Sequence, residues 1–144
     1  MNFTLIKELP EAEKKNLIRF FLKSKPYPFC QIPSMSLALF KIKEYIDFLF
    51  DNFSIYIRKD FFIAISVEDE KAIVQFVKGS SFNGISDFEE FRAFFCAQNK
   101  NVKVFYTEIQ RDYKKQKLIR FIKRRDKNAK INLDNDKICV LWNT

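Results

Sequence analysis

Three short apolar runs lie between residues 53 and 77 and are separated only by very short polar turns. The runs are Phe53–Arg58, Phe61–Val67 and Ala72–Val77. Isoleucine, valine and phenylalanine dominate them, as is typical of strands buried in a sheet. Turns of two or three residues can only reverse the direction of the chain between neighbouring strands. The runs therefore predict an antiparallel meander of three strands, around which the rest of the fold must be built.

The segments on either side of this meander have helical or strand-like patterns. Pro10 followed by acidic residues predicts a helix start, and apolar residues spaced by three or four predict further helices. Ser86 and Glu89 match a capping box, which satisfies free backbone amides at a helix start. The expected elements are a strand at Phe3–Ile6, a helix at Pro10–Lys23, a helix from after Pro33 to Asp51, a helix opening at Ser86 and reaching Gln98, a strand at Val102–Ile109, a helix at Tyr113–Lys127, and strands at Ala129–Leu133 and Ile138–Trp142.

The length and the aromatic content of the chain favour one domain. A chain of 144 residues has the size of a single domain, and its 18 phenylalanines supply the apolar area for a sizeable core. We therefore expect one domain over residues 1–144, of the α+β class, with the element order β-α-α-β-β-β-α-β-α-β-β.

Composition argues against a metal site, a disulfide framework and a membrane anchor. The chain has no histidine, and its three cysteines (Cys30, Cys96 and Cys139) are too widely spaced to form a metal-binding pair. Residues 1–9 carry Lys7 and Glu8 and lack the apolar core of a signal peptide. The longest uncharged stretch, residues 26–40, contains three prolines and cannot span a bilayer. We expect reduced thiols, no membrane partner and a cytoplasmic location.

The predicted order of elements resembles, over the whole chain, that of the GNAT (GCN5-related N-acetyltransferase) superfamily. The resemblance implies a mixed, mainly antiparallel twisted sheet flanked by four helices. It also implies a splayed sheet, in which the strand at Val102–Ile109 runs parallel to the one at Ala72–Val77. A narrower match at Ile119–Lys123 resembles a GNAT-like internal virion protein of short-tailed phages. That match implies virion proteins as partners and a location in the virion.

The GNAT resemblance implies an acetyl-CoA loop before the third helix, and this chain departs from its pattern. The family motif is Q/R-x-x-G-x-G/A, whose backbone amides bind pyrophosphate at a helix start. The equivalent stretch, residues 78–90, lacks the Q/R and the paired small residues. Asp87, Glu89 and Glu90 would repel a pyrophosphate. The sequence therefore predicts weak acetyl-CoA binding or none, and no cofactor. A residual anion site would use Lys78, Gly79, Ser80, Ser81 and Gly84.

The resemblance also implies a general acid and a general base. GNAT enzymes tend to place a tyrosine acid in the fourth helix, where this chain offers only Tyr113. The base is a carboxylate on a central strand, and Glu108 is the one placed in that way. Tyr106 shares a face with Glu108 because side chains alternate along a strand. Glu108 with Tyr106 or Tyr113 is therefore the candidate acid–base pair, although the alternative roles as a solvated strand end and core aromatics stay open.

The net charge of +8 is concentrated in one segment. Residues 111–130 contain ten basic and two acidic side chains, so this segment carries the whole net charge. On a helical wheel one exposed stripe is expected. It consists of Lys117, Arg120, Lys123 and Arg124. The stripe is either a solvated face or a surface for a polyanion, such as nucleic acid or an acidic protein surface.

Three functions remain open. The first, which the residues favour, is a non-catalytic GNAT-like binding or structural protein that uses the basic helix. The second is an active N-acyltransferase that binds acetyl-CoA through an atypical loop. The third is a non-specific nucleic-acid-binding protein, because no base-reading motif is present.

Overall fold

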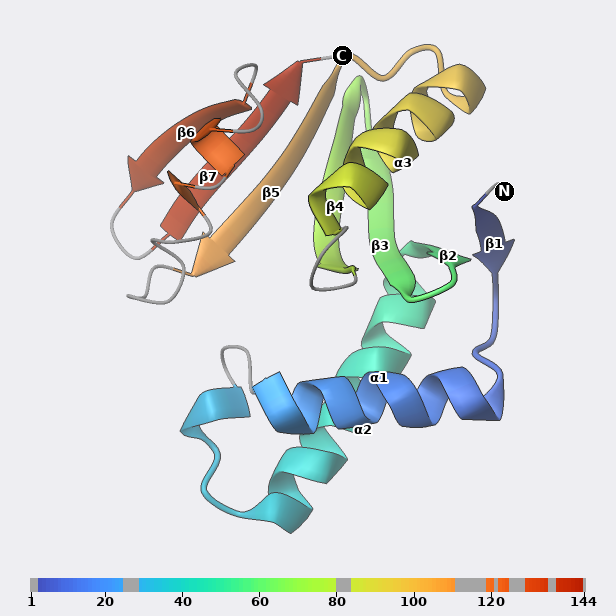
Figure 1. Ribbon diagram of the computed structural model, residues 1–144, viewed down its shortest axis with the longest axis vertical. Coiled ribbons are helices and arrows are strands. Elements are labelled where there is room, and N and C mark those ends of the chain that lie inside the picture. The colour runs from blue at the N-terminus through green and yellow to red at the C-terminus, as the bar shows by residue number, and fades with distance from the viewer. Residues whose placement is uncertain are drawn as a thin grey trace.

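The chain forms one seven-stranded sheet with helices on both of its faces (Figure 1). The computed structural model describes residues 3–24, 29–79, 84–110, 119–120, 122–124, 129–134 and 137–143. The elements are β1 (Thr4–Ile6), α1 (Glu11–Ser24), the 3-10 helix η1 (Phe29–Gln31), α2 (Met35–Asn52), β2 (Ser54–Arg58), β3 (Phe61–Glu68), β4 (Lys71–Lys78), α3 (Gly84–Gln98), β5 (Val104–Gln110), β6 (Ala129–Asp134) and β7 (Lys137–Asn143). The strand order is β1-β2-β3-β4-β5-β7-β6.

The predicted meander is confirmed. β2, β3 and β4 pair antiparallel in sequence order, with Arg58 opposite Phe61 across the first turn. Lys59 in that turn has a left-handed backbone (φ 51°), which is the conformation that a tight hairpin turn requires. β1 extends the meander on one side. The α+β class is therefore confirmed together with the mainly antiparallel sheet.

The parallel pairing of β4 with β5 is also confirmed, and it is short. Four residue pairs join the strands, from Lys71–Val104 to Val74–Thr107. The Thr107 hydroxyl donates to the carbonyl oxygen of Val74 at 2.9 Å, which closes the paired part. Beyond it, β4 continues beside β3 and β5 continues beside β7, so the two strands diverge (Figure 1).

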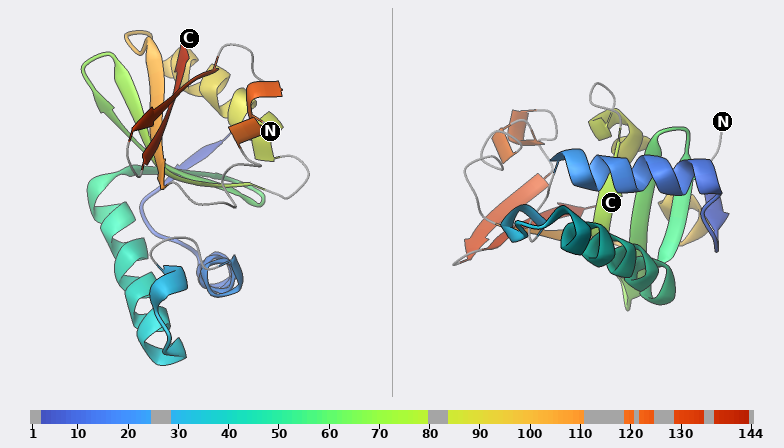
Figure 2. Two further views of the ribbon diagram at one scale, coloured as in Figure 1. Left: turned by 90° about the vertical axis from the view of Figure 1, so that its left-hand side faces the viewer. Right: turned by 90° about the horizontal axis from the view of Figure 1, so that it is seen from below.

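The two faces of the sheet carry separate hydrophobic cores. One core packs α3 against the sheet from its first strands to β7 and includes Phe91, Phe105 and Trp142. The other packs α1 and α2 against β2 and β3 and includes Leu49 and Phe62. Figure 2 shows α1 and α2 on one side of the sheet and α3 on the other. Among the described residues the second core includes none from β5 or β7, and this difference shapes the candidate site.

The structure corrects one predicted boundary and confirms another. α3 begins at Gly84, two residues before Ser86, so the predicted capping box at Ser86 is wrong and Ser86 lies inside the helix. Ser34 caps α2, and its hydroxyl accepts from the amide of Leu37 at 3.3 Å. Of the predicted helix at 113–127, residues 119–120 and 122–124 are described, and they are helical.

No helix within the described ranges has both the length and the apolar composition needed to cross a bilayer. In the same ranges, no three cysteine, aspartate or glutamate side chains lie close enough together to hold a metal ion.

Candidate functional site

Tyr106 and Glu108 lie together where β5 leaves β4. The Tyr106 hydroxyl donates to Glu108 Oε1 at 2.8 Å. Phe105 points into the core under α3, so Tyr106 and Glu108 point to the opposite face, the one that α1 and α2 cover further along the sheet. Glu108 is the first residue of β5 beyond the last pair with β4. The structure thus brings together two of the three predicted acid–base residues, and Tyr113 lies outside the described residues.

Cys139 is a third member of this cluster. Its Sγ lies 3.2 Å from the Tyr106 hydroxyl oxygen, and β7 holds Cys139 directly opposite Glu108. A phenol has one proton to donate, and a carboxylate is a stronger acceptor than sulfur. Tyr106 is therefore held by Glu108 as proton acceptor, with Cys139 as a weaker neighbour. Sequence reasoning missed Cys139 because the contact depends on β7, rather than β6, lying beside β5.

Tyr106 stays protonated at neutral pH. Its contact with Cys139, its burial and the nearby Glu108 carboxylate raise the pKa of Tyr106 above the usual value for tyrosine. The Lys71 ammonium lies 5.0 Å from the centre of the Tyr106 ring, as a cation–π contact. A phenol with a raised pKa serves as a hydrogen-bond donor that orients Glu108, and it is a poor source of protons for catalysis.

The predicted anion-binding residues are only partly described. The Lys78 ammonium donates to the carbonyl oxygen of Asp60 at 3.1 Å and lies 5.5 Å from the centre of the Phe20 ring. Gly79 follows β4, and Gly84 is the first residue of α3. Ser80 and Ser81 lie outside the described residues. Lys78 is thus held at the turn between β2 and β3, and nothing described brings it to the start of α3.

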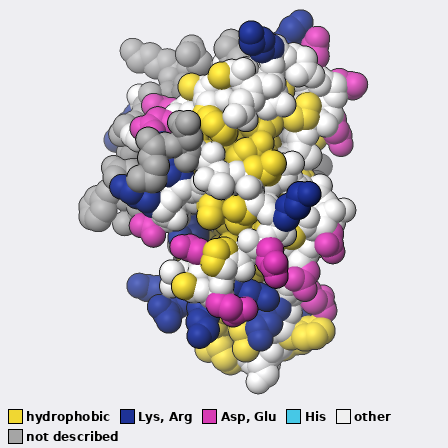
Figure 3. Space-filling model, turned by 90° about the vertical axis from the view of Figure 1, so that its right-hand side faces the viewer, with side chains coloured by type: hydrophobic (Ala, Val, Ile, Leu, Met, Phe, Trp, Pro, Cys, Tyr) yellow, Lys and Arg dark blue, Asp and Glu magenta, His cyan; other side chains and the backbone are white. Residues whose placement is uncertain are grey.

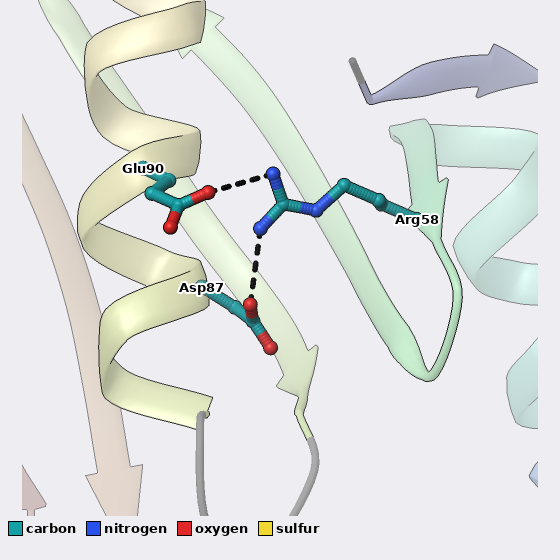
Figure 4. Close-up of polar contacts among 3 residues, drawn as sticks. All are labelled: Arg58, Asp87 and Glu90. Carbon is teal, nitrogen blue, oxygen red and sulfur yellow. Dashed lines mark hydrogen bonds and ion pairs between the residues drawn. The ribbon is translucent and has the colours of Figure 1, made fainter. Parts of the chain in front are cut away.

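Arg58 joins the end of β2 to the first turns of α3 (Figure 4). Its guanidinium lies 3.0 Å from Asp87 Oδ1 and 2.7 Å from Glu90 Oε2, through two different nitrogens. It also lies 4.0 Å from the centre of the Phe3 ring. Burial lowers the pKa of Arg58, but the hydrogen bonds to Glu90 and Asp87 and their negative charges together raise it by more. The net pKa is raised, so the guanidinium stays charged.

This ion pair changes the electrostatics that the sequence predicts for the start of α3. From the sequence, the carboxylates of Asp87, Glu89 and Glu90 are all expected to repel a phosphate there. In the structure the single guanidinium of Arg58 contacts two of these carboxylates, Asp87 and Glu90, and its one positive charge offsets about half of their charge. Sequence reasoning missed Arg58 because it lies 29 positions from Asp87.

The described part of the basic helix has the predicted orientation. Ile119 and Ile122 are buried in the core under α3. Arg120, Lys123 and Arg124 are exposed. Lys117 lies outside the described residues. Three of the four basic residues of the predicted stripe are therefore available to a partner.

The cluster and the diverging strands together form a site with three properties. Glu108 provides a carboxylate that can accept a proton, and Tyr106 fixes its position. The edges of β4 and β5 beyond Val74 and Thr107 face each other without being paired to each other. The first turns of α3 provide backbone amides next to two carboxylates that share the positive charge of Arg58.

The likeness to known proteins is one of structure. No protein-family model matches the sequence, and no curated protein matches it. The structure is similar to the N-acetyltransferase PaiA from Thermoplasma acidophilum in complex with coenzyme A, at 15% identity, with 100% of each chain covered and a TM-score of 0.59. It is similar to the N-acetyltransferase PseH from Campylobacter jejuni, at 10% identity, 99% and 97% coverage and a TM-score of 0.57. A GNAT-family acetyltransferase from Listeria monocytogenes matches at 10% identity, 99% and 95% coverage and a TM-score of 0.57.

Proposed function

Because the chain has the GNAT fold, we propose that it binds an acyl-CoA between the diverging ends of β4 and β5 and transfers the acyl group to an amine. The observation that carries this proposal is the end of the β4–β5 pairing at Val74 and Thr107, directly beside Glu108. The proposal takes up the second of the three functions that the sequence leaves open.

The diverging strands suit an extended ligand that carries amides. Residues 76–78 of β4 and 108–110 of β5 form pairs only on their outer sides, with β3 and β7 respectively, and the register of β4 against β3 shifts at Gln75. Backbone amides and carbonyls left at such an edge need partners, and a peptide-like chain supplies them by adding to the strand. The pantetheine arm of coenzyme A has two amides in an extended chain. PaiA, which shares this fold, was solved with coenzyme A.

The start of α3 suits the phosphate end of the same ligand. Free amides in the first turn of a helix and the helix dipole favour an anion. The predicted repulsion from Asp87 and Glu90 is weakened because Arg58 contacts both carboxylates. The Q/R-x-x-G-x-G/A motif is still absent, so we expect the phosphates to contribute less affinity than the strand edges do.

Glu108 is assigned as the proton acceptor. An acyl-CoA supplies a thioester, whose acyl carbon forms a bond to the amine nitrogen as the bond to the CoA sulfur breaks. Coenzyme A leaves as a thiolate and takes up a proton from the solvent to become the free thiol. Glu108 accepts the proton that the amine loses, directly or through a water. Tyr106 donates its hydrogen bond to Glu108 and fixes the carboxylate in place. Tyr106 therefore acts as a positioning residue, in place of the acid role that the sequence predicts.

Calorimetric titration of the full chain with acetyl-CoA tests the proposal. We expect a dissociation constant tighter than about 10 μM, which is roughly −7 kcal/mol. Release of free thiol is then measured with an α-amino peptide, a polyamine and an amino sugar as acceptors. Weaker binding together with no thiol release would contradict the proposed function. The fold assignment would still hold, and the non-catalytic binding function would then be favoured.

A second function is supported by the basic helix. We infer that Arg120, Lys123 and Arg124, with Lys117 of the same stripe, form a polyanion-binding surface. The exposure of the three described residues beside the buried Ile119 and Ile122 supports this orientation. Contacts of this kind reach phosphates and carry no base readout, so nucleic acid would be bound without sequence preference. An acidic protein surface has the same chemistry. The virion partner stays a prediction.

The salt dependence of duplex DNA binding tests this surface. Four phosphate contacts imply a log–log slope of about −3.6, so a fourfold rise in salt weakens binding by a factor on the order of 100. Replacing the four residues by glutamine should remove most of the slope and leave the fold intact. Undetectable binding at ~50 mM salt would make the stripe a solvated face. Unfolding of the variant would mean that the stripe packs against the body of the protein.

A further inference from the structure

The outer face of α2 carries an unusual set of exposed side chains. Of the eight large hydrophobic residues that are exposed within the described part of the chain, four belong to α2. They are Leu37, Phe40 and Phe48 on the outer face, and Met35 at the start of the helix on the side of Ile42. Figure 3 shows exposed hydrophobic and basic side chains at the lower end of the molecule, the end that α1 and α2 form in Figure 1. Such a concentration on one helix marks a contact surface.

The exposed residues have the spacing of a helix–helix seam. Leu37, Lys41, Glu44, Phe48 and Asp51 follow each other at steps of four, three, four and three residues, and all five are exposed. This is a heptad spacing, in which the apolar Leu37 and Phe48 enclose the charged Lys41 and Glu44. The opposite side of α2 holds Ile42, Ile46 and Leu49 in the core. The seam therefore faces away from the rest of the protein.

The charges along the seam are arranged for an antiparallel partner of the same sequence. A two-fold axis midway between Ile42 and Lys43 places Leu37 opposite Phe48 of the partner subunit, and Lys41 opposite Glu44 of the partner subunit. A parallel pair would instead place each lysine against a lysine. Lys41 and Glu44 already lie 3.6 Å apart within one helix, and about half of each side chain is exposed. In the antiparallel pair, two lysines and two glutamates alternate in sign around the axis.

The same axis compensates an unfavourable charge at the end of α2. Asp51 lies in the last turn, where the helix dipole disfavours an acidic group, and this turn contains no basic residue. The antiparallel arrangement places Asp51 beside Ser34 of the partner subunit, at the start of α2, where the dipole favours a carboxylate. The acidic residues Glu44, Asp47 and Asp51 would repel an anionic lipid surface.

We propose that the exposed face of α2 is a self-association surface, on which two copies of this chain pair antiparallel through Leu37, Lys41, Glu44 and Phe48. The seam spans about two heptads of a helix that is ~27 Å long at 1.5 Å per residue. That is less contact than a standard interface buries, so the dimer is weak, with a dissociation constant on the order of 10 to 100 μM. The surface is independent of the proposed acyl transfer.

Sedimentation equilibrium of the full chain over a concentration series tests the proposal. We expect a reversible monomer–dimer equilibrium for the wild type. Each of the variants Lys41→Glu and Glu44→Lys creates two pairs of like charges across the two-fold axis. Either change should weaken the dimer by about tenfold or more. Both positions are exposed, so thermal unfolding of the two variants should match the wild type.

Mixing the two variants gives the decisive measurement. At the axis, the Lys41→Glu chain carries only carboxylates and the Glu44→Lys chain carries only ammonium groups. Every pair across the axis of a mixed dimer therefore has opposite charges, and a heterodimer should form from two chains that are monomeric alone.

Four results would overturn the proposal. The first is a wild type that stays monomeric at ~500 μM. The second is an equimolar mixture of the variants that does not associate, and the third is either variant dimerising as well as the wild type. The fourth is binding of the wild type to phosphatidylserine vesicles without self-association.

Discussion

The two faces of the sheet are covered to different extents. On the α3 face, the core extends from Phe3, next to β1, to Trp142 on β7, and Ala129 and Ile131 of the edge strand β6 pack against it, so the whole width of the sheet is covered. On the other face, α1 and α2 pack against β2 and β3, with Phe76 of β4 at the border. Tyr106 and Glu108 on β5 and Cys139 on β7 lie beyond that border. Within the described residues, the α3 face is packed from edge to edge, whereas the other face leaves the Glu108 carboxylate exposed beside the diverging strands.

This comparison separates residues by role. Substitutions on the covered face should reduce the free energy of unfolding. Substitutions of the uncovered polar cluster should change chemistry and leave stability nearly unchanged.

The largest effect is expected on the covered face. Phe91 is fully buried and contacts the rings of Phe3, Tyr56 and Phe95. Phe91→Ala should lower the free energy of unfolding by about 3–5 kcal/mol, because the cavity cannot collapse between packed rings. Urea unfolding measures it. Leu133→Ala, at an exposed position of β6, is the matched control and should change stability by under about 0.5 kcal/mol. Equal losses in both variants would contradict the comparison.

Glu108→Gln should have the next largest effect, on activity alone. The amide keeps an acceptor for the Tyr106 hydroxyl but cannot accept a proton, so the rate of thiol release should fall by about 100-fold or more. Acetyl-CoA affinity and urea unfolding should stay close to wild type because Glu108 is exposed. An undiminished rate would remove Glu108 from the chemistry, and a large loss of stability would place it with the covered face.

Arg58→Met should have a moderate effect at the border between the two roles. The variant leaves Asp87 and Glu90 without their shared partner, and unfolding free energy should fall by about 1–2 kcal/mol. Acetyl-CoA should bind several-fold more weakly, because the carboxylates are then uncompensated at the start of α3. Arg58→Lys keeps the positive charge but cannot contact both carboxylates through two separate nitrogens of a guanidinium. It should recover part of the unfolding free energy and part of the acetyl-CoA affinity. If acetyl-CoA binding is unchanged in Arg58→Met, the start of α3 does not hold the phosphates.

The smallest effect is expected from the titration of Tyr106. Its contact with Cys139, its burial and the Glu108 carboxylate raise the pKa of Tyr106 in the folded state. The unfolded chain releases this proton near pH 10, so the stabilising contribution is complete below that pH and is lost as the pH rises further. Burial also raises the pKa of Tyr45 and Tyr56, so wild-type stability should fall above about pH 10. In Tyr106→Phe, the unfolding free energy measured with urea should fall less steeply above about pH 10 than in the wild type. An identical fall in both would mean that the pKa of Tyr106 is not raised by folding.

Local patterns in the sequence were enough for most of the fold. The short turns at 59–60 and 69–70 leave β2, β3 and β4 no alternative to an antiparallel meander, and the structure confirms it. The parallel pairing of β4 and β5 follows from the resemblance to the GNAT superfamily and is also confirmed. The predicted start of α3 is wrong because Ser86 fits a capping pattern, whereas the helix itself extends back to Gly84.

The candidate site could be predicted only where it depends on one strand. Tyr106 and Glu108 share a face because they are two residues apart on β5, and the structure brings them within hydrogen-bonding distance. Cys139 lies 33 positions from Tyr106, and Arg58 lies 29 from Asp87. Contacts at such separations depend on which strands and helices become neighbours, and no periodicity in the sequence encodes that.

The short parallel joint between β4 and β5 also has a consequence for the order of folding. The pairs within β2–β4 and between β6 and β7 link segments that are close in sequence, so little chain entropy is lost when they form. Val74 and Thr107 lie 33 positions apart with α3 between them, and they belong to the only parallel pair among the described strands. We expect this joint to form late, after the meander and the C-terminal hairpin have formed separately. Partly folded chains would then contain most of the sheet while lacking the diverging strand edges altogether, so ligand binding would report on completed folding.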